Sequence, residues 1–119
     1  MLNLKSIGRY LFTVPFVLFG LMHLLNANEM AGMVPSFIPG GVLWVYVTGL
    51  ALIAAGVSFV IQKHTYLAGI LSAALMLVFV FTIHLPGVIG GNMMAMSGLL
   101  KDLGLAGGAL MLASNYQQS

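Results

Sequence analysis

Residues 42–61, VLWVYVTGLALIAAGVSFVI, form an uninterrupted apolar run without a charged side chain. An α-helix rises about 1.5 Å per residue, so about 20 residues cross the hydrocarbon core of a bilayer. Apolar residues occupy every side of this run rather than one stripe, which is typical of a lipid-facing helix and not of a soluble bundle. The run therefore predicts a transmembrane helix.

Similar apolar runs cover residues 8–25, 66–85 and 93–113, which gives four predicted spans in all. The chain between them is short and rich in breakers: residues 26–41 contain two prolines and a Gly-Gly pair, residues 62–65 form a polar turn, and residues 86–92 begin with Pro86. The sequence thus predicts a single all-α domain over residues 1–119, an integral membrane four-helix bundle.

The composition supports this class and excludes several functions. Of the 119 residues, 61% are hydrophobic and 5% are charged, whereas about a quarter of the residues are charged in a typical soluble domain. The net charge of +2 gives no basic surface for nucleic acid. With 0 Cys, the chain has no disulfide, thiol catalyst, thiolate-held zinc or cysteine-ligated iron-sulfur cluster. We expect no intrinsic cofactor.

The basic residues predict the orientation. Lys5, Arg9 and Lys63 fall on the side of the termini, and Lys101 alone belongs to the other side, so the positive-inside rule places both termini in the cytoplasm. No A-x-A cleavage site follows Leu25, which favours an uncleaved first span over a secretory signal. At the inner end of that span, Arg9 is expected to be a membrane anchor that snorkels to headgroups.

This topology brings the polar groups of distant segments toward the outer membrane face. We expect them to form one cluster with a ligand-binding or structural role, made of His23, Glu29, His84, Asn92, Lys101 and Asp102. Ionisable groups inside a membrane are costly and are commonly functional, but they also hold helices together. The cluster is therefore either a satisfied polar plug that fixes the helix register or a pocket for the polar head of a ligand.

Lys101 and Asp102 enter the membrane with the fourth span. Neighbours on a helix lie about 100° apart, so each side chain is expected to seek a partner on another helix. Lys101 shares a stripe with Gly104 and Gly108, which predicts that its stem points into the bundle. In the pocket interpretation, a quinone carbonyl would accept a hydrogen bond from a histidine or from Lys101, and Asp102 would set the imidazole tautomer.

Small residues predict the helix contacts. Gly104 and Gly108 form a GxxxG face, Gly69 with Ala73 forms a related face, and Gly20 lies one turn before His23. Six methionines at the outer end could hold Cu(I), but methionine is also an ordinary filler of apolar gaps, so we expect no metal site. Motifs of hydrolases, nucleotide-binding proteins and zinc proteases are absent from the sequence, and no catalytic residue is assigned.

Three segments resemble the DoxX family of small bacterial membrane proteins. They are Arg9 followed by Gly20 and His23, the stretch Thr82-Ile83-His84-Leu85-Pro86, and Leu99-Leu100-Lys101-Asp102 running to Gly107-Gly108-Ala109-Leu110. The resemblance implies a compact four-helix bundle in the bacterial cytoplasmic (inner) membrane. DoxX-like and DoxD-like proteins are linked with thiosulfate:quinone oxidoreductase subunits and with oxidative-stress assemblies.

Two interpretations follow. In the first, the chain is a quinone- or lipid-contacting subunit of a membrane redox system, with membrane lipid and a redox protein as partners. In the second, it is a non-catalytic structural or assembly partner of another membrane or periplasmic protein, or of further copies of itself. An enzyme that acts alone is the least favoured.

Overall fold

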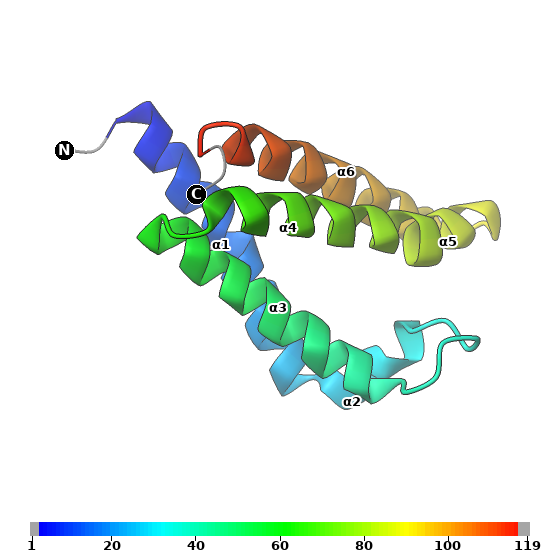
Figure 1. The fold of residues 1–119 in the computed structure, drawn as a ribbon. Coiled ribbons are helices and arrows are strands. Elements are labelled where there is room, and N and C mark those ends of the chain that lie inside the picture. Colours follow the sequence, from blue (N-terminus) through cyan, green and yellow to red (C-terminus); the bar gives the residue numbers. More distant parts are fainter. Residues whose placement is uncertain (1–2, 117–119) are drawn as a thin grey trace. The chain divides into compact units, whose positions relative to one another are not determined.

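The structure, a computed structural model, describes residues 3–116, and every regular element in that range is helical. Four long apolar helices dominate it (Figure 1). They are α1 (Leu4–Leu25), α3 (Val42–Ile61), a continuous helix over Thr65–Ile89, and α6 (Met93–Ala113). Each is long and apolar enough to cross a membrane, which confirms the prediction of an all-α chain with four such helices.

The first helix begins at Leu4, earlier than the predicted residue 8. Asn3 caps it, because its side chain accepts a 2.9 Å hydrogen bond from the backbone N–H of Ser6. Asparagine is a favoured N-cap residue, since its side chain satisfies a donor that has no partner within the helix. Hydropathy alone missed this start because Lys5 and Ser6 lower the apolar character of the first turn.

The connection after α1 is more ordered than the predicted break. It contains the short helix α2 (Ala27–Met30) and the 3₁₀ turn η1 (Ala31–Met33) before the proline-rich segment. The Trp44 indole then donates a 2.6 Å hydrogen bond to the Pro39 carbonyl, back across Gly40 and Gly41. Both glycines have positive φ values, 104° and 39°, which side chains at these positions would strain.

The third long helix does not end at residue 85 as predicted. It consists of α4 (Thr65–Phe79), the π-helix η2 (Val80–His84) and α5 (Leu85–Ile89), and so it continues past Pro86. Proline has no N–H to donate and its ring crowds the carbonyl four residues earlier. In the wider π turn, Leu85 N–H bonds to the Val80 carbonyl five residues back, which absorbs the proline without ending the helix.

The chain divides between Thr65 and Tyr66 into two compact units. In the first unit, α1 and α3 pack as an antiparallel pair (Figure 1). Gly20 and Gly49 let the backbones meet, because a Cβ on Gly20 would lie 2.8 Å from the Gly49 carbonyl oxygen. Toward the other end, the buried rings of Phe16 and Phe59 meet edge to face, with centroids 5.4 Å apart. Gly20 therefore lies in the contact between α1 and α3.

In the second unit, the Thr65–Ile89 helix and α6 lie side by side (Figure 1). Gly69 lets the backbones of the two helices approach closely, since a Cβ there would lie 2.8 Å from both the Ala109 carbonyl oxygen and the Ala113 Cβ. Gly69 therefore lies in the contact between these two helices. A Cβ on Gly104 would meet nothing within 4 Å, and Gly108 is half-buried.

The face of α6 that packs in this unit lies about 150° around the helix from the Gly104 and Gly108 stripe. Its buried residues recur at helical spacing: Asp102, Ala106, Ala109 and Ala113. In this helix pair the small side chain of alanine allows the close contact.

Candidate functional site

Asp102 is a carboxylate buried in the middle of an apolar helix. It is the tenth of the 21 residues of α6, and only 3% of its surface is exposed. At 1.5 Å per residue it lies about 14 Å from the first residue of the helix, near the midpoint of a span of this length. A carboxylate so placed needs a partner, because an unpaired buried charge costs several kcal/mol, on the order of 3 or more.

His84 is the first partner. Its Nε2 lies 2.8 Å from Asp102 Oδ2, and the imidazole side chain is 15% exposed. Because a carboxylate only accepts hydrogen bonds, Nε2 carries the proton that it donates. In a neutral imidazole, Nδ1 then carries the lone pair.

The π-helix positions this histidine. His84 is the last residue of η2, two positions before Pro86, where the wider turn rotates the side chains that follow relative to a regular helix. Such π turns occur frequently at functional sites. Sequence reasoning placed His84 at a helix end, whereas the helix continues to Ile89, so the imidazole lies within the helix and not at its tip.

Lys101 is the second partner of the carboxylate. Its Nζ lies 3.6 Å from Asp102 Oδ1, so each carboxylate oxygen faces a different cationic or donor group. The prediction that these two neighbours would not pair is wrong, since the long lysine stem spans the 100° step between them. The Lys101 side chain is 45% exposed and the Asp102 side chain 4%. The buried stripe of α6 contains residue 102 and not residue 101.

Gly98 makes room for the imidazole. It lies one helical turn before Asp102, and a Cβ built on it would come within 2.6 Å of His84 Cε1 and 2.7 Å of Nδ1. Any side chain at position 98 would therefore displace the ring from the carboxylate. The sequence analysis missed Gly98, although its spacing of four residues from Asp102 places both on one helix face. We name the three side chains of His84, Lys101 and Asp102 the triad site, and Gly98 makes room for it.

The other predicted histidine has a different environment. His23, in the first unit, approaches its own helix, with Nδ1 2.6 Å from the Phe19 carbonyl oxygen. It also packs against a glycine, since a Cβ on Gly49 would lie 2.8 Å from the His23 Cβ. In the second unit, Asp102 follows Gly98 by one helical turn. In the first unit, the residue one turn after Gly49 is Ile53, which is apolar. The first unit thus has a similar histidine-glycine contact without a carboxylate.

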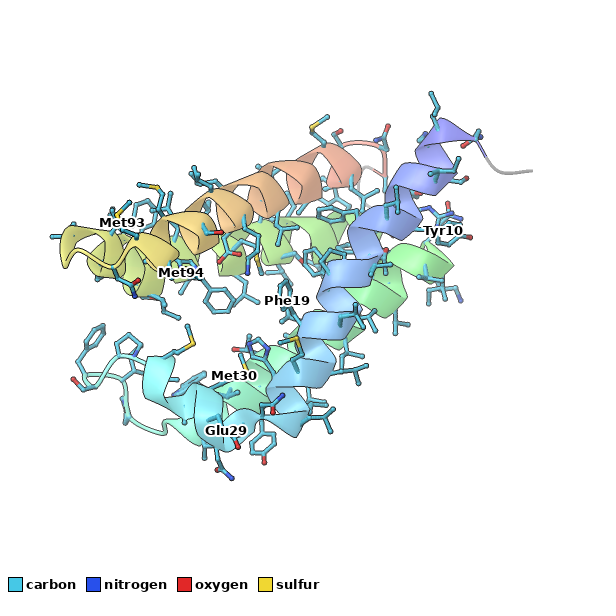
Figure 2. The ribbon with its side chains drawn as sticks, turned by 180° about the vertical axis from the view of Figure 1, so that it is seen from behind. Tyr10, Phe19, Glu29, Met30, Met93 and Met94 are labelled. Carbon is cyan, nitrogen blue, oxygen red and sulfur yellow. The ribbon has the colours of Figure 1, made fainter. Side chains whose placement is uncertain are left out.

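Of two further members of the predicted cluster, Asn92 caps a helix and Glu29 is exposed. Asn92 caps α6, with its side-chain oxygen accepting a 3.0 Å hydrogen bond from Met94 N–H. Glu29 lies exposed on α2 (Figure 2). The structure thus joins His84, Lys101 and Asp102 directly, while the gathering of all six groups at one face stays a prediction.

Arg9 differs from the expected membrane anchor. It is 7% exposed, and its Nη1 donates to the carbonyls of Phe59 and Val60 at 2.9 and 3.0 Å. The last carbonyls of a helix have no partners within it, so the guanidinium caps α3 and offsets the negative end of its dipole. The group also lies 4.6 Å from the centroid of the Tyr10 ring. Local sequence patterns could not predict this contact, because Arg9 and Phe59 are 50 positions apart.

The methionines considered as Cu(I) ligands belong to both units. Met93 and Met94 are exposed on the first turn of α6, and Met30 lies on α2 (Figure 2). Within residues 3–116, no three His, Asp or Glu side chains come together in a way that could hold a metal ion.

Comparison with known families gives one match. Residues 12–106 match the family described as Domain of unknown function (DUF8561). The chain belongs to this family. The match to DUF8561 extends over parts of both units and includes the triad site and Gly98. Searches of curated proteins and of solved structures gave no match.

Proposed function

We propose that this DUF8561 member is an integral membrane protein of the bacterial inner membrane, with four spans that form one bundle and both termini in the cytoplasm. The support is the length and hydropathy of the four helices and their surfaces. Large apolar side chains are exposed along all of them, among them Leu11 (67%), Leu50 (60%), Leu71 (59%) and Leu100 (60%). Lipid accommodates such surfaces, whereas in water they would drive aggregation.

We further propose that the triad site binds the head group of a quinone or quinol, as a membrane subunit of a redox system related to the DoxX family. One observation carries this proposal: a carboxylate at the middle of an apolar helix is paired with an imidazole that a π turn positions. Intramembrane ionisable residues commonly mark ligand or proton sites.

The chemistry of the pair suits such a head group. Lys101 Nζ lies 3.6 Å from one oxygen of the Asp102 carboxylate, and the other oxygen accepts the His84 Nε2 proton. The Nδ1 of His84 can then accept a hydrogen bond from a quinol hydroxyl. A protonated imidazole, stabilised by Asp102, would instead donate one to a quinone carbonyl. In this proposal the electrons pass to or from a partner redox protein.

A second candidate function also rests on a specific observation. Both oxygens of Asp102 already have partners, and direct pairing of this kind can serve purely to fix two helices in register. In that case the chain is a non-catalytic structural or assembly partner in the membrane, for another protein or for a second copy.

Native mass spectrometry of the mildly solubilised protein separates the two functions. The wild type, His84→Gln and the control Gly104→Ala are each incubated with a benzoquinone that carries a short alkyl tail. The ligand site predicts one quinone retained by the wild type and by the control, and loss of retention in His84→Gln with the helical content intact. If no protein retains quinone and His84→Gln only unfolds more easily, the structural function is favoured.

A further inference from the structure

The first unit carries a separate feature, an open apolar groove along α1. It is lined by Tyr10, Thr13, Val14, Val17 and Leu18 of α1 and by Val60 of α3. These α1 positions share one face, and from Tyr10 to Leu18 they extend about 12 Å along the helix. The hydroxyl of Thr13 does not donate a hydrogen bond into the groove, because it donates one of 2.7 Å to the Arg9 carbonyl. The lining is therefore apolar throughout.

One end of this groove adjoins a group of positive charges. Tyr10, which lines the groove, lies beneath the Arg9 guanidinium, and Arg9 in turn bonds to the carbonyl of the lining residue Val60. Lys5 lies one α1 turn before Arg9, and Lys63 lies three residues after Val60, just past the end of α3. In the antiparallel register that Arg9 and Val60 define, both lysines are at the same end of the unit.

The three cations have no acidic counterpart at this end. Within residues 3–65 the one acidic residue is Glu29, which belongs to α2 at the opposite end of the helix pair. Lys5 and Lys63 are both exposed, while Arg9 is buried and donates hydrogen bonds to backbone carbonyls of α3. The two lysines are thus available to an anion, and Arg9 adds a fixed positive charge behind them.

We infer that this end of the first unit binds one anionic phospholipid. Its phosphate would lie at Lys5 and Lys63, and one acyl chain would lie in the groove from Tyr10 to Leu18. The inference rests on the proposed membrane location but not on the quinone site. Exposed lysines near a membrane surface favour anionic lipid, whereas an apolar groove alone would bind any acyl chain. The juxtaposition of charge and groove therefore specifies a lipid with a net negative headgroup.

The test uses the full chain and two lipids with identical acyl chains, phosphatidylglycerol and phosphatidylcholine, offered in equal amounts and counted as retained adducts by native mass spectrometry. The wild type should prefer one phosphatidylglycerol. Each of Lys5→Gln and Lys63→Gln should lower that preference about 5-fold, since each basic residue contributes about that factor at a membrane surface. Arg9 stays unchanged, so the α3 cap is preserved.

The second part of the experiment fills the groove with a larger side chain. Val14→Trp should reduce the retention of both lipids, whereas Leu11→Trp, on an α1 position that is 67% exposed and outside the groove, should not. Equal retention of both lipids by the wild type, or a preference unchanged in both lysine variants, overturns the inference. So does a change in dimer content in place of lipid retention in Val14→Trp, because the groove is then an interface between copies.

A separate measurement distinguishes failure of the inference from failure of the proposed membrane location. Alkaline carbonate releases peripheral proteins from membranes and leaves integral ones behind. Release of the chain by carbonate contradicts the membrane location itself. Retention without a headgroup preference contradicts only the phospholipid site.

Discussion

His84 Nε2 lies 2.8 Å from Asp102 Oδ2, across 18 residues of chain and between the two helices of the second unit. This contact brings together the π turn of one helix and the buried stripe of the other. It requires a glycine opposite the ring, and it leaves the second carboxylate oxygen to Lys101. The first unit packs a histidine against a glycine in a similar way but has Ile53 in place of the carboxylate.

Replacement of Gly98 should break this contact. In Gly98→Ala the new Cβ would lie 2.6 Å from His84 Cε1, so the ring must move away from Asp102. We expect a loss of about 1–3 kcal/mol, as for other overpacked sites, measured by circular dichroism during unfolding in a denaturing detergent. Gly104→Ala is the matched control on the same helix, and it should be neutral or slightly stabilising because its Cβ meets nothing within 4 Å. Equal effects of the two substitutions would contradict the role of Gly98.

Removal of the carboxylate alone should be costly. Asp102→Leu leaves the mostly buried imidazole of His84 without its acceptor, and breaking a buried pair in this way costs about 3–5 kcal/mol. The double variant Asp102→Leu with His84→Leu should recover most of that loss, since apolar replacement of a whole buried pair is often neutral. The same unfolding titration compares the two proteins. A double variant no more stable than the single one would show that the ion pair does not account for the cost.

Close packing of α1 on α3 can be tested at Gly49. In Gly49→Ala the added methyl would lie 2.8 Å from the His23 Cβ and 3.0 Å from the backbone oxygen of Gly20, neither of which moves easily. Destabilisation of about 1–3 kcal/mol is expected. Gly8→Ala, in the same unit and with nothing within 4 Å, serves as the control. The account of this interface is contradicted if Gly8→Ala is the more harmful change.

Arg9 should matter for folding and not only for membrane attachment. Arg9→Met keeps an apolar stem of similar length but leaves the Phe59 and Val60 carbonyls without their donor. Loss of hydrogen bonds from a charged group costs about 1.5–3 kcal/mol each, which sets the scale of the expected destabilisation. Lys5→Met, four residues earlier and exposed, should have little effect on unfolding. Equal stability of Arg9→Met and the wild type would instead favour a simple anchor.

Hydropathy predicted where the four long helices lie because that signal is summed over about 20 residues. It did not predict their ends, since these depend on single groups: the Asn3 cap and the π turn that carries the helix past Pro86. The predicted starts of α3 and α6 agreed because Gly41 and Asn92 directly precede these helices.

The sequence indicated the ionisable residues of the site but not their geometry. His84, Lys101 and Asp102 were selected as ionisable groups inside apolar spans, which needs no geometry. That Asp102 lies on the stripe of α6 that packs in the second unit was not predicted, because two stripes of small residues run along α6 and only packing decides between them. The Arg9 cap depends on contacts 50 and 51 residues away, and no local spacing encodes them.

The most direct test of the account follows the two nitrogens of His84 by NMR in lipid nanodiscs, with ¹⁵N-labelled histidine and with His23 and His64 assigned by substitution. As the short-tailed benzoquinone is added, we predict that the Nδ1 resonance of His84 shifts and saturates while Nε2 stays bonded to Asp102. The Asp102→Asn variant should lose this response. A His84 spectrum that is unchanged at saturating quinone would contradict the claim that the triad site binds a quinone head group.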